Sequence, residues 1–419
     1  MFALVDGNNF YASCERVFRP DLRDTPIVIL SNNDGVIIAR SNEAKALGVP
    51  MGLPYFKSKD IILKNKIQVF SSNYALYGDM SNRMMNILRT FSPEVEIYSI
   101  DEAFLKLSGF DNFNLTDYGI EIRKTVLKST GLPTSVGIAP SKALSKVANK
   151  IAKKYPEQTK SSYVIDTPEK IEKALKWTKI EDVWGIGRKH AKRLQDINVR
   201  TAYQFTQLSD EWVRSHMSVI GLRLKKELLG ESVLDIELVP RKKSIATTCS
   251  FDKTHTELED IKERVSSFAF SCAEKLRKQN THCNSLMVFI HTNGFKTGEA
   301  QYYKSIVVKL PYPTHSSIDL VKYANKGLEL IFKKGFNYKK AGVIVNDLSP
   351  ENTEQLSLFS NKNKAHKELM KTMDKLNSSY GHHIIKLGSQ DIKKTWKMKQ
   401  ENLSQRYSTN LNEIIDINV

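Results

Sequence analysis

The N-terminal part of the chain alternates short apolar runs with longer stretches in which apolar residues recur every three or four positions. Short apolar runs predict buried strands, and the longer spacing predicts amphipathic helices. We therefore expect strands at 2–5, 27–30, 36–40, 94–99, 103–107 and 135–139. We expect helices at 9–18, 42–47, 73–91, 115–129 and 142–154, the last with Ser141 as a favourable N-cap.

The order of these elements predicts an α+β fold. From 73 to 154 the chain runs helix, strand, strand, helix, strand, helix, and residues 2–6 supply one more strand. That order favours an antiparallel-rich sheet with helices on one face. Further along, we expect a helical region at 170–230, a linker at 231–243, an alternation of strands and helices at 244–349, and a polar stretch after Pro350.

The charge of the chain narrows the class of partner. Its 419 residues carry a formal net charge of +17, which predicts nucleic acid or an acidic membrane surface as a partner. No apolar run is long enough to span a membrane, and the N-terminus does not resemble a signal peptide. The four cysteines show no CxxC spacing, which argues against a structural zinc site or disulfides and fits a cytoplasmic location: Cys14, Cys249, Cys272 and Cys283.

Three acids are placed where they could bind a metal ion. Asp6 ends a buried strand, and Asp101 and Glu102 occupy a tight turn between two strands. At a turn two neighbouring side chains can converge, and Mg²⁺ prefers oxygen ligands and keeps positions open for substrate phosphates. Two such ions can hold the attacking and leaving oxygens of a phosphoryl displacement. Solvated turn acids are the alternative, but the apolar strands around them and the partner at Asp6 favour the metal site.

A basic stripe lies on the predicted helix 142–154. Its lysines recur every four residues, and no acid interrupts them: Lys142, Lys146, Lys150 and Lys154, with Lys153 alongside. Such a stripe is often a solvated face. In a chain of this charge it favours contact with phosphates.

A second basic segment follows two glycines. Gly185 and Gly187 predict a turn that exposes backbone N–H groups at the start of a helix, where an anion can bind. The basic residues that follow are Arg188, Lys189, Lys192 and Arg193. The pattern resembles a helix–hairpin–helix that grips the DNA backbone without reading its sequence. A packing element without DNA contact is the alternative.

Five long motifs, in order along the chain, resemble those of Y-family translesion DNA polymerases, and most of all the UmuC-type catalytic subunit of DNA polymerase V. The motifs are ALVDGNNFYASCE, SNNDGVIIARSNEAKALGVPMG, FSSNYALYGDMSNRMM, YSIDEAFL and SVGIAPSKALSKVANKIAKK. The resemblance implies a right-hand polymerase with a ferredoxin-like palm. The implied domains are a palm at 1–11 and 73–165, fingers at 12–72, a helical thumb with the helix–hairpin–helix at 166–230, a linker at 231–243, an α/β little finger at 244–349 and a C-terminal tail at 350–419.

The resemblance also implies roles for residues of the nucleotide site. Asp6 and Asp101 bridge two Mg²⁺ ions, Glu102 completes the shell of the catalytic ion, and the Gly7 carbonyl binds the ion on the nucleotide side. Tyr11 is the steric gate that excludes a 2′-hydroxyl, and Lys153 contacts the incoming triphosphate. Asn42 and Lys45 stand where the family pattern has a tyrosine and an arginine on the nucleotide, and a lysine offers a point charge rather than a two-pronged fork.

The tail contains one apolar pentapeptide in a polar stretch. Gln355, Leu356, Leu358 and Phe359 resemble the peptide that docks into the bacterial sliding clamp; a core segment at a strand end is the alternative. The basic, partly helical residues 364–407 match the region that UmuC-like chains use for a cleaved UmuD-like accessory dimer and a RecA-type recombinase filament.

The sequence therefore predicts a bacterial, nucleoid-associated, error-prone DNA polymerase. It would extend primed, damaged DNA with deoxynucleoside triphosphates during the DNA damage (SOS) response, without proofreading because no exonuclease-like acid cluster is evident. Three alternatives remain: a polymerase IV-like enzyme without an accessory dimer, a nucleotidyl cyclase with a similar palm, and a non-catalytic DNA-bound scaffold.

Overall fold

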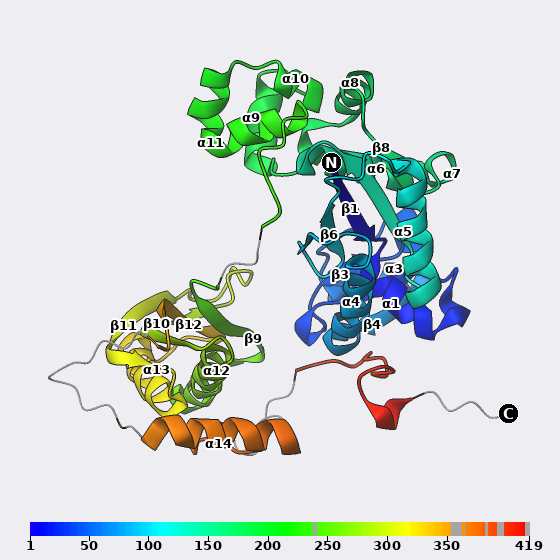
Figure 1. Cartoon of the computed structure of the whole chain (residues 1–419). Coiled ribbons are helices and arrows are strands. Elements are labelled where there is room, and N and C mark those ends of the chain that lie inside the picture. Colours follow the sequence, from blue (N-terminus) through cyan, green and yellow to red (C-terminus); the bar gives the residue numbers. More distant parts are fainter. Residues whose placement is uncertain (238–240, 353–362, 364, 382–383, 392–397, 415–419) are drawn as a thin grey trace. The chain divides into compact units, whose positions relative to one another are not determined.

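The computed structural model describes residues 1–237, 241–352, 363, 365–381, 384–391 and 398–414. The chain forms two compact units, one of Met1–Val239 with Gln400–Val419 and the other of Pro240–Lys399. The chain therefore leaves the first unit, builds the second, and returns to the first (Figure 1). The division at 239 and 240 falls inside the stretch 231–243 that the sequence predicts as a linker.

The first unit is built on a five-stranded sheet in the order β5-β6-β1-β7-β8. The pairs β5–β6, β6–β1 and β1–β7 are antiparallel, and β7–β8 is parallel. The antiparallel-rich α+β sheet is thus confirmed, with β8 as a strand that the sequence analysis missed. The strands are β1 (Phe2–Gly7), β5 (Val95–Ile97), β6 (Glu102–Lys106), β7 (Thr134–Ala139) and β8 (Ser162–Val164).

Helices cover both faces of this sheet, so the prediction of helices on one face is wrong. On one face, α4 (Tyr74–Leu88) and α5 (Leu115–Thr130) pack with the short α1 (Phe10–Phe18) over alternate residues such as Val136 and Ile138. On the other face lies α6 (Lys142–Lys154), with Gly137 directly under it. Successive strand residues point to opposite faces, so β7 serves both layers. Ser141 accepts a hydrogen bond from the Leu144 N–H, which confirms the predicted N-cap.

A second, three-stranded sheet with the order β3-β2-β4 has its own small apolar core. The sequence analysis found β2 and β3 and missed β4 and α3. Its elements are β2 (Ile27–Leu30), β3 (Ile37–Arg40), β4 (Gln68–Ser71), α2 (Asn42–Ala46) and α3 (Tyr55–Lys64), with 3₁₀ turns at Pro20–Leu22 and Asn32–Asp34.

Residues 168–228 are helical, as predicted, and share one core with α6. The buried Glu227 fastens them to α6, because its carboxylate accepts the Ala143 N–H at 3.1 Å and its carbonyl accepts the Ser141 hydroxyl at 2.5 Å. The short α7 (Pro156–Thr159) precedes this region. The helices of the region are α8 (Pro168–Trp177), α9 (Arg188–Asp196), α10 (Ala202–Thr206) and α11 (Asp210–Leu228), with a 3₁₀ turn at Ile180–Asp182.

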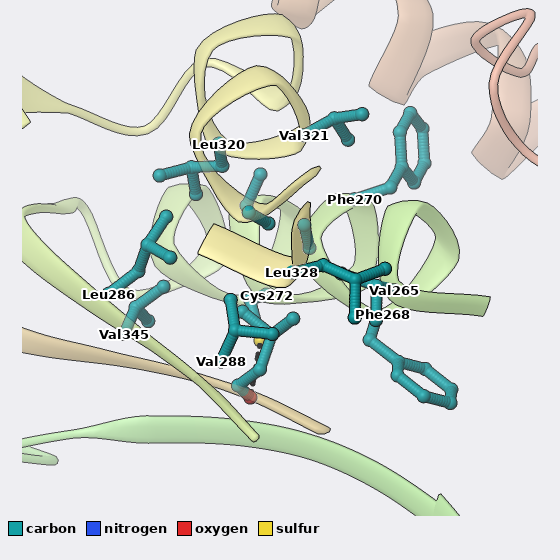
Figure 2. Close-up of a cluster of buried hydrophobic side chains, with 14 of the residues drawn as sticks. Val265, Phe268, Phe270, Cys272, Leu286, Val288, Leu320, Val321, Leu328 and Val345 are labelled. Atoms are coloured by element: carbon teal, nitrogen blue, oxygen red, sulfur yellow. Dashed lines mark hydrogen bonds between the residues drawn. The ribbon is translucent and has the colours of Figure 1, made fainter. Parts of the chain in front are cut away.

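The second unit is an antiparallel sheet in the order β11-β10-β12-β9. Figure 2 shows its core, where Val265 and Cys272 of one helix and Leu320 and Leu328 of another gather over Val288 of the central strand. The elements are β9 (Ile245–His255), α12 (Leu258–Lys278), β10 (Thr281–Thr292), β11 (Tyr303–Thr314), α13 (Ser317–Ile331) and β12 (Tyr338–Pro350).

The stretch predicted as a single tail is divided between the two units. Helix α14 (Ala365–Tyr380) buries Met370 and Met373 in the core of the second unit, and Asp374 accepts two hydrogen bonds from Arg277 at 2.6 and 2.7 Å. Residues 400–413, which end in a 3₁₀ turn at Leu411–Glu413, pack on the first unit.

The close approach of α6 to β7 generates a stability prediction. A Cβ on Gly137 would lie 2.1 Å from the Asn149 nitrogen and 2.3 Å from the Ser145 oxygen, both of them helix backbone. We expect Gly137→Ala to lower the free energy of unfolding by about 1–3 kcal/mol or more, because overpacked backbone cannot give way as a side-chain tip can. Urea denaturation measures this change.

Gly78→Ala is the matched control. Gly78 lies inside α4, and a Cβ there would have no atom within 4 Å. Alanine should raise stability at that position, by roughly 1 kcal/mol, through helix propensity alone. Equal unfolding midpoints for Gly137→Ala and the wild type would refute the close approach.

Candidate active site

A sharp turn follows Asp6, which lies near the C-terminal end of β1 in the main sheet. Strand β1 is buried along its whole length and ends at Gly7, whose N–H donates to the Asp101 carbonyl at 2.8 Å. Asn9 then adopts the left-handed conformation with φ 47°, which asparagine tolerates better than most residues, and α1 begins at Phe10. The strand end and the start of the helix therefore meet at the same point.

Asp6 and Glu102 face each other across neighbouring strands. They are direct partners in the β1–β6 register, so both side chains point to the face that α6 covers. The two carboxyl groups lie close enough to influence each other's pKa. Two lysines of α6 reach them: Lys153 Nζ lies 2.5 Å from Asp6 Oδ1, and Lys146 Nζ lies 2.7 Å from Glu102 Oε2.

The pKa values of the two acids shift in opposite directions. Burial raises the pKa of Asp6, with Lys153 opposing the shift and Glu102 adding to it. For Glu102, burial also acts to raise the pKa, but hydrogen bonds from Asp6 and Lys146 outweigh it and hold the pKa below its usual value. A partly buried carboxyl pair of this kind favours binding of a cation, because a cation lets both groups ionise.

Asp101 is attached to the end of β1 through its backbone, while its side chain is held elsewhere. Its carbonyl accepts the Gly7 N–H, while its carboxylate accepts the Ser99 hydroxyl at 2.6 Å. The three carboxylates do not all lie within 4.8 Å of one another. The expected convergence of Asp101 and Glu102 is therefore incomplete, because Glu102 begins β6 and turns to the α6 face.

The acids open onto a pocket of about 950 Å³ within the first unit. Asp6, Gly7, Asp101 and Tyr11 line it at one end. Its cationic residues come from three segments: Arg40 and Lys45, Lys150 to Lys154, and Lys179. The sequence analysis missed Arg40, although its position at the end of a predicted strand, next to the EAKALGV motif, was a usable signal.

Asn42 and Lys45 lie beside the turn after β1. Asn9 donates to the Asn42 side chain at 3.0 Å, and the Lys45 ammonium group donates to the Asn9 side chain. Burial lowers the pKa of Lys45, and the nearby charges of Arg40 and Lys153 lower it further. Three mutually repelling cations in one pocket favour a polyanionic ligand.

Tyr11 stands in the pocket on the first turn of α1. Its ring stacks on Tyr77 with centroids 4.5 Å apart and planes 18° from parallel, and Tyr74 contacts it edge-on at 6.2 Å. Tyr74 and Tyr77 both belong to the first turn of α4. The sequence analysis quoted their motif but did not assign them to the site.

Most lysines of the basic stripe of α6 form ion pairs inside the protein, so contact of the stripe with phosphates stays a prediction. Besides the pairs with Asp6 and Glu102, Lys142 is 3% exposed and pairs with Glu96, and Lys150 pairs with Asp182 at 2.5 Å. The stripe faces the acids of the sheet, so its charge is largely balanced internally. Lys153 and Lys154 remain at the pocket wall.

The glycine turn leads into an exposed helix end. Gly185 has φ 87°, a conformation that favours glycine, and Gly187 is the residue before α9. Ala191 and Leu194 anchor α9 in the core. The exposed residues are Gly185, Gly187, Arg188, Lys189, Lys192 and Arg193.

The second unit contains another group with metal-ligand chemistry. His282, His315 and Glu351 have ligand atoms within 4.8 Å of one another, and no other set of three does so among the residues that the structure describes. Lys367 Nζ already lies 2.8 Å from Glu351 Oε1, so the carboxylate has a cationic partner from the protein.

Along the described part of the chain, every helix is too short or too polar to cross a membrane.

The donor set at the end of β1 fits Mg²⁺. Asp6, Asp101, Glu102 and the Gly7 carbonyl offer only oxygen ligands, which hard divalent ions prefer. In this structure the ammonium groups of Lys153 and Lys146 neutralise Asp6 and Glu102, at the positions where a divalent cation would bind.

The predicted clamp peptide, Gln355 to Phe359, lies outside the described residues.

Comparisons with known proteins identify the family of the chain. The impB/mucB/samB family matches residues 5–150, its C-terminal domain matches 242–358, and a domain of unknown function, DUF4113, matches 367–417. Protein UmuC of Salmonella typhimurium is 42% identical over the full length of both chains. DNA polymerase IV of Bacillus velezensis is 25% identical over 92% of each, which favours the UmuC type.

Solved structures agree on the fold. A Y-family DNA polymerase chimera superposes with a TM-score of 0.69 at 22% identity, over 84% of this chain and all of the other. The chain belongs to the impB/mucB/samB family, and it is a UmuC-type, Y-family DNA polymerase that carries out error-prone translesion synthesis in the DNA damage response.

Proposed function

We propose that this chain transfers nucleotides with two Mg²⁺ ions held by Asp6, Asp101 and Glu102. Asp6 and Asp101 would hold both ions, Glu102 would hold the catalytic ion, and the Gly7 carbonyl would hold the nucleotide-side ion. Ions bound there would supply activation of the primer 3′-hydroxyl and stabilisation of the departing pyrophosphate. The observation that carries this proposal is the partly buried Asp6–Glu102 pair, of which Asp6 lines a pocket that also contains several cations.

The cations of the pocket suit a triphosphate. Lys153, Lys45 and Arg40 come from two sides of the same cavity. Lys153 is 37% exposed although it pairs with Asp6, so it can turn to an incoming phosphate. We propose that Lys153 and Lys45 contact the triphosphate, that Asn42 positions Lys45 through Asn9, and that Arg40 joins them.

The exposed end of α9 suits a phosphate of the DNA duplex. Gly185 and Gly187 free the backbone N–H groups at the start of the helix, and Arg188, Lys189 and Lys192 surround them with positive charge. We propose that this element grips the duplex and that the chain acts on primed, damaged DNA at the bacterial nucleoid.

The C-terminal region suits protein partners. The outward face of α14 carries Lys371 and Lys375, while Met370 and Met373 anchor the helix. We propose that residues 364–407 contact a cleaved UmuD-like accessory dimer and a recombinase filament, and that Gln355–Phe359 binds the sliding clamp.

Removing either acid of the turn tests the metal assignment. We expect Asp101→Ala and Glu102→Ala each to reduce primer extension by on the order of 100-fold or more, because the charge that develops in phosphoryl transfer would lose its metal ligand. A primed-template assay with Mg²⁺ measures this loss. Glu94→Ala is the matched control, since Glu94 is half exposed and pairs only weakly with Lys106 at 3.6 Å. Near-normal extension by either site variant would refute the assignment.

Tyr11→Ala tests the steric gate. Without the ring, a 2′-hydroxyl no longer meets a clash, and discrimination against ribonucleotides should fall by about 10-fold or more. Tyr11→Phe keeps the ring and should keep the discrimination. The ratio of kcat/KM for a deoxynucleotide to that for its ribonucleotide measures the effect. An unchanged ratio for Tyr11→Ala would rule the gate out.

Deleting residues 355–359 tests the clamp peptide. Clamp-stimulated synthesis should fall because the apolar anchors are lost, and basal extension should persist because the deletion removes none of the proposed metal, nucleotide or DNA contacts. Ser357→Ala, within the same pentapeptide, removes no anchor and serves as the control. Equal loss of basal and stimulated synthesis would contradict the assignment.

A further inference from the structure

Residues 400–413, which we call the C-terminal strap, bind the first unit through polar contacts (red in Figure 1). The Ser71 N–H donates to the Asn402 carbonyl at 2.9 Å, and the Asn402 N–H donates to the Ser71 hydroxyl at 3.0 Å. The Glu401 N–H donates to the buried Asp34 carboxylate at 2.9 Å. The strap thus supplies partners to buried polar groups, which makes its binding specific.

The strap also fixes the start of α4. Asn73 is the N-cap of that helix, since its side-chain oxygen accepts the Leu76 N–H at 3.2 Å. Its amide nitrogen donates to the Ser404 hydroxyl at 2.9 Å and to the Gln405 carbonyl at 3.2 Å. Asn73 is 3% exposed, so it depends on these partners for hydrogen bonds.

One strap residue reaches a buried acid on α1. The Ser404 hydroxyl donates to Glu15 Oε1 at 3.1 Å, and the Tyr77 hydroxyl donates to the same oxygen at 2.6 Å. Glu15 is fully buried. Burial raises the pKa of Glu15 to about 7, and the hydrogen bonds from Tyr77 and Ser404 oppose that shift. The strap therefore helps to hold an acid that would otherwise be poorly solvated.

The contacts continue from Glu15 to the nucleotide pocket. Tyr11 and Glu15 lie one turn apart on α1, and Tyr77 spans them: its hydroxyl binds Glu15 while its ring stacks on Tyr11. Tyr77 is fully buried, so its ring forms a fixed wall behind Tyr11. The hydroxyl of Ser404 is thus the outer end of a connected series that ends at a residue of the pocket.

We propose that the C-terminal strap positions Tyr11 through Ser404, Glu15 and Tyr77, and thereby sets the selectivity of the polymerase for deoxynucleotides. The proposal rests on the steric-gate role proposed above for Tyr11. It gives a function to residues 400–413, which fall in the part of the chain that matches a domain of unknown function. Ser404, Glu15 and Tyr77 act as positioning residues, because none of the three is among the residues that line the pocket.

The physical reason is that a steric gate discriminates only as long as its ring cannot move. A 2′-hydroxyl is rejected only if the ring of Tyr11 cannot yield, and the stack on Tyr77 is what resists its displacement. Losing one buried hydrogen bond in the series should weaken that resistance, relaxing the discrimination by about 5-fold. The effect is directed at the ribonucleotide, so deoxynucleotide incorporation should be little changed.

The test compares two serines of the strap in the full-length chain. Ser404→Ala removes the donor to Glu15. Ser408→Ala is the matched control, because the Ser408 hydroxyl is buried and makes no hydrogen bond among the described residues. Tyr77→Phe keeps the stacked ring and removes the inner donor. Each variant is assayed for incorporation of a deoxynucleotide and of its ribonucleotide, alongside Tyr11→Ala, and for thermal unfolding.

We expect Ser404→Ala and Tyr77→Phe to lower the deoxynucleotide-to-ribonucleotide ratio through the KM for the ribonucleotide, with kcat for the deoxynucleotide retained and Ser408→Ala unchanged. In a Tyr11→Ala background, Ser404→Ala should have no further effect on the ratio. If Tyr11→Ala lowers the ratio and neither Ser404→Ala nor Tyr77→Phe does, the strap proposal is overturned and the gate stands. If Tyr11→Ala leaves the ratio unchanged, both proposals fail. A strap variant that only lowers the unfolding temperature would also overturn the positioning role.

Discussion

The active site depends on the register that sets Asp6 opposite Glu102 in neighbouring antiparallel strands. Two carboxylates at such a position repel by about 4 kcal/mol at 4 Å when the effective dielectric constant is near 20. The fold offsets this repulsion with the ammonium groups of α6, which requires that helix to lie close to the sheet. Gly137 makes that approach possible, because any side chain there would meet the helix backbone. The packing of α6 on the sheet and the stability of the two neighbouring carboxylates therefore depend on the same close contact.

The need to balance acids inside the protein also accounts for part of the large positive charge of the chain. Part of it balances acids inside the protein: Lys142 and Lys146 on the sheet, and Arg277 on Asp374 in the second unit. Arg264 and Lys275, which lie on the same helix as Arg277, also contact the protein, Arg264 with Asp391 and Lys275 with the carbonyl of Ala246. The exposed cations Arg188, Lys189 and Lys192 at the start of α9 are different, since none of them pairs with an acid among the residues that the structure describes. Net charge left nucleic acid and an acidic membrane surface open as partners, and it did not distinguish structural cations from those that face a substrate.

Local patterns in the sequence predicted local structure well. The apolar run before Asp6, the turn at Asp101 and the cap at Ser141 have signals within a few residues, and the strands and helix appear where those signals lie. The face that α6 covers has no such signal, because it depends on which side of β7 carries a glycine. The direction of the Asp101 carboxylate was missed for a similar reason: the hydroxyl that holds it belongs to Ser99, and Glu102 had already entered the next strand. The role of Tyr77 was missed because it depends on Glu15, sixty-two positions away.

The return of the chain to the first unit could not be predicted from apolar periodicity, because polar contacts dominate the attachment of the strap. Its amides and hydroxyls satisfy Asp34, Asn73 and Glu15, each of which is buried and would lose a partner without it. Among the described residues of the strap, the ring of Tyr407 stacks on Phe18 and adds an apolar contact. A polar segment of this composition would ordinarily be assigned to a linker. Here the buried acids of the catalytic unit supply the missing information, because a carboxylate such as Glu15 is tolerated in a core only when something donates to it.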